Sequence, residues 1–381
     1  MAQEKLLLIP GPSPVVPRIL DALARATVSH VGPEMVRELR GACENLKKIV
    51  FSAKGEPFVV AGAGTLSMEM ALLNVVGPGD RVLVVSQGYF GQRMGQICEA
   101  FGLPHDVLEC EWGKAVLPEE LASRLAEQPY EVVVCTHVDT ATGASAPVEA
   151  YARAVRKAGA LFVVDGVCAT GGIAERMDDW AIDVVLTAAQ KCLGTPPGLS
   201  VLVLSERAME KRRSLPSVPA YYADLLRWLP VMQNPTRYFS TPCVNEIRAF
   251  YEGTRIIMEE GLEARFARHD LFARAMRTGL AALGFGFFTD PNFLASTLSV
   301  VTYPEGVDDK AFRSALYENG VVVAGGLAQT AGQVFRMGHM GNLAADEVLF
   351  ALAAVEKTLI ALGRNVKAHA SSGAAREVLS G

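Results

Sequence analysis

The segment DVVLTAAQKCLGTPPGL, residues 183–199, places a single lysine, Lys191, directly after a run of mainly apolar residues. The run is typical of a buried strand, and the Gly-Thr-Pro-Pro-Gly after it is typical of a loop. A lysine at the end of a buried strand loses part of its hydration, which favours a reactive amine over a solvated surface charge. Lys191 is therefore the first candidate for chemistry.

Two other strand-like runs also end in groups that bind charged ligands. The turn GAGT, residues 62–65, follows the run EPFVVAG and opens a helical pattern, so free N–H groups and the positive end of a helix are available to a phosphate. Asp165 closes the run ALFVVD, 26 residues before Lys191. Taken singly, the glycines are explained by a tight turn and the aspartate by a helix cap.

Together the three groups match the needs of one cofactor, pyridoxal phosphate. Its aldehyde forms a Schiff base with a lysine, its ring nitrogen stays protonated beside a carboxylate, and its phosphate needs an anchor. In doubly wound sheets ligands bind at the carboxyl ends of the strands, so Thr65, Asp165 and Lys191 are expected to lie together. The sequence predicts a pyridoxal phosphate site and contains no metal-binding pattern.

Short valine-rich runs alternate with helical patterns through the first half of the chain. Strands are expected at 56–62, 81–88, 130–137, 160–166, 182–189 and 199–205, and helices at 65–76, 91–101, 118–127 and 148–158. Strands that are apolar almost throughout suit a mainly parallel sheet covered on both faces. We expect an α/β fold.

The chain divides into four parts by composition and pattern. We expect an N-terminal arm at 1–15, a large cofactor-binding domain at 16–250, a smaller α+β domain at 251–364 and a disordered tail at 365–381. The last assignment rests on the small and polar residues of HASSGAAREVLSG.

The overall composition argues against nucleic-acid and membrane partners. The formal net charge is −5 with both signs interspersed, and the most apolar windows are interrupted by Glu69, by Asp80 or by glycines and prolines. Seven cysteines are scattered without a CxxC pair, which indicates reduced thiols and a cytoplasmic protein.

From PGPSPV at residue 10 to about residue 364, the chain resembles the class V, fold-type I aminotransferases of the alanine–glyoxylate, serine–glyoxylate and pyridoxamine–pyruvate group. The matching segments are PGPSP, GAGTLSMEMALLNVVGPGD, QGYFGQR, THVDTATG, VVDGVCATGG, AQKCLGTPPGLS, YFSTPCVNEI and VFRMGHMG. The resemblance implies the aspartate aminotransferase-like fold, in which a large domain with a mixed, mainly parallel sheet is followed by a smaller α+β domain.

The resemblance also assigns roles to individual residues. It implies a Schiff base at Lys191, Asp165 on the pyridine nitrogen, and Val167 and Phe90 on opposite faces of the ring. The other implied cofactor contacts are Gly64, Thr65 and Gln190 at the phosphate, Thr140 through its hydroxyl, and Tyr238 and Thr241 from a neighbouring subunit. The active unit is therefore expected to be a homodimer with shared active sites.

Arg336 is the expected site for the substrate carboxylate. It lies in the otherwise apolar segment QVFRMGH, where an unpaired guanidinium is costly, so a structural salt bridge is the alternative explanation.

The implied activity is transamination between a small amino acid and a small 2-oxo acid, of the alanine–glyoxylate type with glyoxylate or pyruvate as acceptor. Pyridoxamine–pyruvate, serine–glyoxylate and ureidoglycine–glyoxylate transamination are alternatives, and the sequence leaves the amino donor open. A cysteine desulfurase is disfavoured because no cysteine follows Cys243. A non-catalytic relative is expected to have lost Lys191 or Asp165, and both are present.

Overall fold

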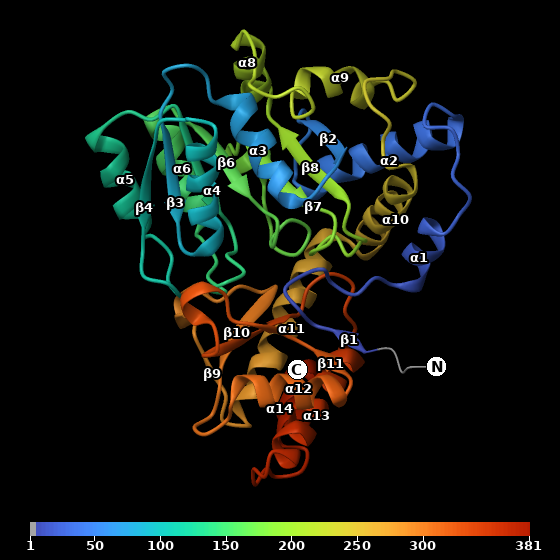
Figure 1. Cartoon of the computed structure of the whole chain (residues 1–381), viewed down its shortest axis with the longest axis vertical. Coiled ribbons are helices and arrows are strands. Elements are labelled where there is room, and N and C mark those ends of the chain that lie inside the picture. Colours follow the sequence, from blue (N-terminus) through green and yellow to red (C-terminus); the bar gives the residue numbers. More distant parts are fainter. Residues whose placement is uncertain (1–4) are drawn as a thin grey trace.

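The computed structural model describes residues 5–381, with a large domain above a smaller one in Figure 1. The elements of the large domain are, in chain order, α1 (Pro17–Leu23), α2 (Pro33–Ile49), β2 (Glu56–Ala61), α3 (Gly64–Val75), β3 (Val82–Ser86), α4 (Tyr89–Ala100), β4 (His105–Glu109), α5 (Pro118–Glu127), β5 (Val132–Thr136), α6 (Val148–Ala158), β6 (Leu161–Asp165), α7 (Met177–Trp180), β7 (Val184–Ala188), β8 (Leu199–Leu204), α8 (Glu206–Ser214), α9 (Leu225–Gln233) and α10 (Val244–Glu260). The small domain contains α11 (Leu262–Ala281), β9 (Gly286–Phe287), η1 (Pro291–Phe293), β10 (Leu298–Thr302), α12 (Asp309–Glu318), β11 (Val321–Val322), β12 (Ala324–Gly325), η2 (Ala328–Thr330), β13 (Val334–Gly338), α13 (Ala345–Ala361) and α14 (Ala370–Ser380), and strand β1 (Leu6–Leu7) of the N-terminal arm pairs with it.

The large domain is built on a seven-stranded sheet with the order β2-β8-β7-β6-β5-β3-β4. Its strands pair in parallel except β8, which is antiparallel to both of its neighbours. The register sets Thr136 of β5 beside Asp165 of β6, and Asp165 beside Leu186 of β7. The carboxyl ends of the parallel strands therefore meet at one edge, and the expected α/β fold is confirmed.

Strand β4 was not expected from the sequence. It is an edge strand that pairs only with β3, and its residues HDVLE are partly or fully exposed. Because one side of it faces solvent, it lacks the continuous apolar run that marks the central strands.

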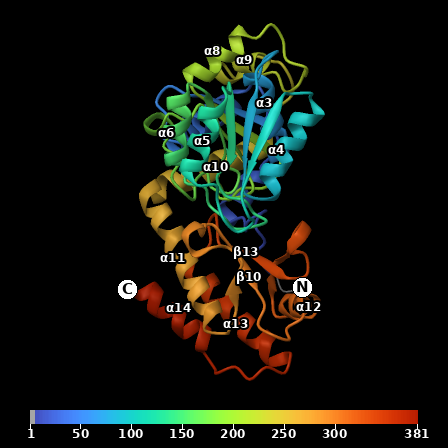
Figure 2. The same cartoon turned by 90° about the vertical axis from the view of Figure 1, so that its left-hand side faces the viewer.

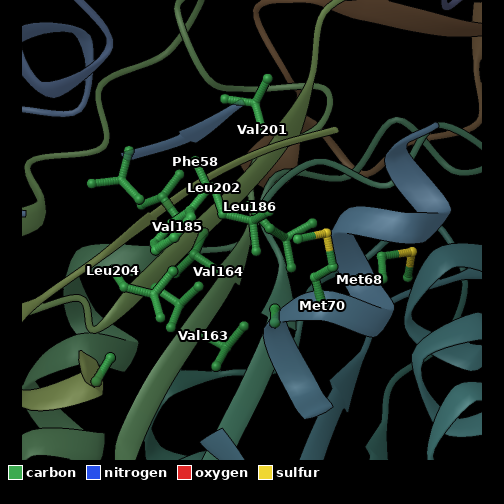
Figure 3. Close-up of a cluster of buried hydrophobic side chains, with 14 of the residues drawn as sticks. Phe58, Met68, Met70, Val163, Val164, Val185, Leu186, Val201, Leu202 and Leu204 are labelled. Carbon is green, nitrogen blue, oxygen red and sulfur yellow. The ribbon is translucent and has the colours of Figure 1, made fainter. Parts of the chain in front are cut away.

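The core of the large domain packs the sheet against helix α3. In Figure 3, strand side chains such as Val164, Val185 and Leu202 pack together, with Met68 and Met70 of α3 nearby. Each fully buried valine, leucine or methionine contributes roughly 1.5–3 kcal/mol. The first turn of α3 is thereby fixed at the carboxyl edge of the sheet.

The connection between the domains runs through two consecutive helices. Residue 250, the boundary expected from the sequence, falls inside α10, which packs on α1 and α2 and is buried in the large-domain core as far as Ile257. Gly261, with φ +82°, separates α10 from α11, and α11 descends into the small domain (Figure 1). We therefore propose the boundary at Gly261.

The small domain has its own sheet and core. Its four strands have the antiparallel order β12-β13-β10-β9. Leu8 of the N-terminal arm is buried in this core, and β1 pairs in parallel with β11. The arm is thus attached to the small domain, while Met1–Glu4 lie outside the described residues.

The structure corrects the expectation of a disordered tail, because residues 370–380 form helix α14, which packs on α11 and α13 (Figure 2). Ser371 is buried and donates hydrogen bonds to Glu356 from its backbone N–H and its hydroxyl. A Cβ added to Gly279 of α11 would lie 3.0 Å from the carbonyl oxygen of Ser371. The small residues that suggested disorder instead allow two helices to approach closely.

Within residues 5–381, none of the helices combines the length and the apolar character needed to cross a membrane.

Candidate active site

A cavity of about 210 Å³ lies at the carboxyl edge of the large sheet. A single buried water needs only roughly 10–15 Å³ on this measure, so the cavity has room for a ring-sized ligand. The residues predicted from the sequence that line it are Gly64, Thr65, Phe90, Thr140, Asp165, Val167, Gln190 and Lys191. The structure thus brings together residues from five separate segments of the chain.

Lys191 follows strand β7 and is enclosed by the N-terminal arm. Its Nζ donates to the carbonyl oxygen of Pro10, and the hydroxyl of Ser13 donates to the Lys191 carbonyl at 2.8 Å. A Cβ on Gly11, which has φ +94°, would overlap the Lys191 side chain. The sequence did not assign these arm residues to the site, although the segment PGPSP was a visible signal.

Asp165 ends strand β6 with only 2% of its surface exposed. Its carboxylate accepts the backbone N–H of Val167 at 3.0 Å and the hydroxyl of Thr136 at 3.3 Å, and no other hydrogen bond reaches it from residues 5–381. Burial, together with the negative charges of Asp139 and Glu175, raises the pKa of Asp165 to about 6. A cation placed beside Asp165 would favour its ionised form. Thr136 is a site residue that the sequence did not reveal.

The start of helix α3 offers hydrogen-bond donors to the same cavity. The N-cap residue Ala63 supplies no side-chain cap, so the first-turn N–H groups of Gly64 and Thr65 are available to an anion. A Cβ on Gly64 would lie 3.3 Å from a methyl group of Val167, so the helix begins close beside the loop after β6. Oε1 of Gln190 is buried and has no hydrogen-bond partner among the described residues. An unsatisfied buried amide of this kind is suited to a polar ligand.

Phe90 is held in the cavity by contacts of its backbone with Asp139 and of its ring with Arg93. Its backbone N–H donates to the buried carboxylate of Asp139 at 2.7 Å, so the loop after β5 caps the start of α4. The guanidinium of Arg93 lies 4.7 Å from the centre of the Phe90 ring and 5.1 Å from that of Tyr89. Arg93 also lines the cavity, and its sequence signal was its place in the matching segment QGYFGQR, three residues after Phe90.

Arg336 lies on strand β13 of the small domain, next to the cavity. Its Nε donates to the carbonyl oxygen of Gly325 at 2.7 Å and its Nη1 to that of Thr140 at 3.2 Å. Within residues 5–381 it forms no salt bridge, so the alternative explanation for this residue is not observed. Burial lowers the pKa of Arg336, because its charged form loses hydration and gains no anionic partner among the described residues.

Tyr238 and Thr241 are not brought to the cavity within one chain. They lie in the segment between α9 and α10, where Tyr238 is 64% exposed and its hydroxyl is 3.5 Å from that of Thr241. The ring of His30 lies 5.4 Å from that of Tyr238. Their predicted contact with a neighbouring subunit stays a prediction.

Residues 13–344 match the family model for aminotransferase class V. The chain belongs to the class V aminotransferases. It is 37% identical over 380 residues to an uncharacterized aminotransferase of Methanocaldococcus jannaschii, covering 99% of this chain and 98% of the relative. A solved ureidoglycine–glyoxylate aminotransferase of Bacillus subtilis superposes with a TM-score of 0.94 at 29% identity, covering 100% of this chain and 99% of the other. An alanine–glyoxylate aminotransferase of Nostoc sp. superposes with a TM-score of 0.90 at 31% identity, covering 94% and 96%.

The family and the fold predicted from the sequence, a fold-type I aminotransferase, are thus confirmed. The chain is an enzyme of this class. Its cavity also suits a cofactor with a phosphate and a cationic ring. Among residues 5–381, free N–H groups and an unsatisfied amide lie near a lysine and a buried carboxylate that has no cationic partner. The residues present therefore fit pyridoxal phosphate.

Proposed function

We propose that this enzyme uses pyridoxal phosphate to transfer the amino group of a small amino acid to a small 2-oxo acid, with alanine as donor and glyoxylate or pyruvate as acceptor. The observation that carries the proposal is the single cavity shared by Lys191, Asp165 and the open start of α3. The likeness to an alanine–glyoxylate aminotransferase supports the choice of substrates.

The proposed roles follow from the position of each group. The first-turn N–H groups of Gly64 and Thr65, together with Gln190, would hold the phosphate, while Phe90 and Val167 would cover the faces of the ring and exclude water.

When bound, pyridoxal phosphate supplies an electron sink for negative charge that develops on the substrate α-carbon. Asp165 would keep a proton on the ring nitrogen by supplying a buried negative charge beside it. The amine of Lys191 would move a proton between the substrate α-carbon and carbon C4′ of the cofactor, in one direction in the first half of the reaction and in the opposite direction in the second.

Arg336 would bind the substrate α-carboxylate. Its planar guanidinium offers parallel N–H donors that match two carboxylate oxygens, and the carboxylate would supply the anion that the described residues lack. The Thr140 backbone, which accepts from Arg336, links this carboxylate site to the cofactor cavity.

A donor with a second carboxylate, such as aspartate, is a second candidate. It is favoured by Arg93, a guanidinium that lines the cavity, lies over the rings of Tyr89 and Phe90, and donates to the Tyr89 hydroxyl at 3.5 Å. Arg93 forms no salt bridge with any of residues 5–381. Transamination of pyridoxamine with pyruvate, and of serine or ureidoglycine with glyoxylate, are further candidates that differ from the first in the amino donor.

One experiment separates these functions. The purified protein with bound pyridoxal phosphate is mixed in turn with alanine, serine, aspartate, ureidoglycine and glycine, and its cofactor absorbance is followed. The cofactor-free protein is mixed with pyridoxamine and pyruvate. We expect alanine to convert the cofactor to its amine form fastest, and glyoxylate or pyruvate to reverse the change. If aspartate is fastest and Arg93→Met removes that preference alone, the second candidate is correct. No conversion by any amino acid would overturn the proposal.

The active unit is proposed to be a homodimer in the cytoplasm. The exposed Tyr238 and Thr241 support subunit contact, and seven free cysteines among the described residues support a reducing compartment. Mixing inactive Lys191→Ala protein with inactive Tyr238→Ala protein should restore part of the activity if each site uses residues from both subunits. A fully active monomer would contradict this.

A further inference from the structure

The loop that carries the proposed catalytic lysine, residues 190–194 and here named the lysine loop, is held by donors from outside the large domain. Two of these donors belong to Ser13 in the N-terminal arm. Its backbone N–H donates to the carbonyl of Gln190 at 2.9 Å and its hydroxyl donates to the carbonyl of Lys191 at 2.8 Å. The arm thus satisfies two consecutive carbonyls at the reacting residue itself.

The next carbonyl of the loop is held by Arg265 of helix α11 in the small domain. Nη2 of this fully buried arginine donates to the carbonyl of Cys192 at 2.7 Å, and its Nε donates to the carbonyl of Gly171 at 2.8 Å. Nη1 contacts Glu260 at 2.7 Å and the side-chain oxygen of Asn342 at 3.2 Å. One guanidinium therefore joins the loop after β7 to the loop after β6.

Asn342 extends the same contact to the end of the lysine loop. Its Nδ2 donates to the carbonyl of Gly194 at 3.4 Å, and a Cβ on Gly194 would lie 2.5 Å from that nitrogen. The neighbouring Gly341 accepts a hydrogen bond from Arg268 at 2.9 Å and donates one to His269 at 3.1 Å. Helix α11 thus holds residues 341 and 342, and Asn342 contacts the lysine loop.

A purely structural explanation accounts for the burial of Arg265 but not for its choice of partners. A buried guanidinium needs hydrogen bonds for its N–H groups, and any carbonyls at the domain interface would serve. Here it bonds to the carbonyl next to Lys191 and to the loop that follows Asp165. Both loops lead directly to groups that line the cavity.

We propose that Arg265 is a positioning residue, which together with Asn342 and Ser13 holds the carbonyls of the lysine loop and so sets the position of the Lys191 amine from the small domain. The inference rests on the proposed role of Lys191. It implies that proton transfer by Lys191 depends on the contact between the small domain and the lysine loop. Binding of the substrate carboxylate at Arg336 does not require Arg265.

The test compares Arg265→Lys with Arg248→Lys. Arg248 is a matched control because it is also buried, bonds to Glu38 and to the carbonyl of Ala26, and has no hydrogen bond to the lysine loop. In Arg265→Lys we expect kcat to fall on the order of ten- to a hundredfold, because small displacements of a reacting group have effects of this size. The KM values should change by less than about threefold, because binding is not disturbed.

A second measurement does not depend on turnover. Amide hydrogen exchange of the cofactor-free protein should be faster in the peptide 188–198 of Arg265→Lys and unchanged there in Arg248→Lys. If Arg265→Lys does not fold, Asn342→Ala removes one bond to the same loop and should give the same pattern at smaller amplitude.

The proposal is overturned if Arg265→Lys and Arg248→Lys lose kcat equally, or if exchange in 188–198 does not change. A failure of the proposed function would give a different result. If Lys191 does not carry the cofactor, borohydride will not fix pyridoxal phosphate on Lys191 in the unsubstituted protein, whatever the behaviour of the Arg265 variant.

Discussion

Replacing Asp165 by asparagine should raise the stability of the cofactor-free protein while it weakens cofactor binding. The carboxylate is buried, has no cationic partner among residues 5–381, and its pKa is raised to about 6. Its charged form is therefore unfavourable until a cation occupies the cavity. Asparagine has nearly the same shape and carries no charge.

The magnitude follows from the shift between the unfolded and folded proteins. The pKa rises from 3.8 to about 6, and each unit corresponds to about 1.4 kcal/mol, so ionised Asp165 costs up to about 3 kcal/mol. Between these two pKa values the folded protein binds a proton that the unfolded chain has released. The free energy of unfolding therefore falls as the pH rises from about 4 to 6, and this fall is absent in Asp165→Asn.

Urea unfolding of both cofactor-free proteins at several pH values measures this difference. We expect the stability of Asp165→Asn relative to the unsubstituted protein to increase by about 2–3 kcal/mol between pH 4 and pH 8. In the same interval the unsubstituted protein should bind pyridoxal phosphate more tightly as Asp165 ionises, while the variant binds weakly at every pH. Asp183→Asn is the control, because Asp183 is buried at the opposite end of the strands and pairs with Arg207 at 3.1 Å. It should leave cofactor affinity unchanged.

A relative stability that is independent of pH would show that Asp165 is not a strained carboxylate. A variant that loses stability at pH 8 but retains cofactor affinity would make Asp165 a structural residue and remove it from the site.

The other predictions concern the lysine, the arginine and the C-terminal helix. Lys191→Ala should no longer be fixed to pyridoxal phosphate by borohydride, and covalent fixation in this variant would show that another residue carries the cofactor. Arg336→Lys should keep the cofactor absorbance and raise the KM for amino and oxo acids by roughly tenfold or more, and Arg336→Ala should do so more strongly, since a charge-assisted pair contributes about 1.5–3 kcal/mol. A primary loss of cofactor or of folding would instead identify Arg336 as structural. Deleting residues 370–381 should lower the melting temperature, because Glu356 loses its partner Ser371 at a cost of about 1–3 kcal/mol, and an unchanged melting curve would contradict the packing of α14.

The sequence was sufficient for six of the seven strands of the large sheet, because these six strands are largely buried. Their apolar runs are continuous, so each expected strand has a counterpart in β2, β3 and β5–β8. The edge strand β4 and the helix α14 were not predicted from the sequence, for different reasons. The first is too polar to be distinguished from a loop. The second begins with the small residues ASSGAA, whose close packing depends on Gly279 of α11.

The sequence by itself also predicted that Thr65, Asp165 and Lys191 lie together, because strands β2, β6 and β7 run in the same direction to a common edge and each residue ends or follows one of them. Only the tertiary structure decided what surrounds them. Pro10 and Ser13 reach Lys191 across about 180 residues of chain, and Arg265 reaches the next carbonyl from another domain. Ser13 and Arg265 satisfy carbonyls of an irregular loop, and Pro10 accepts from the lysine amine. Donors and acceptors of this kind can come from any part of the chain. They therefore cannot be predicted from the periodicity or the local motifs of the sequence.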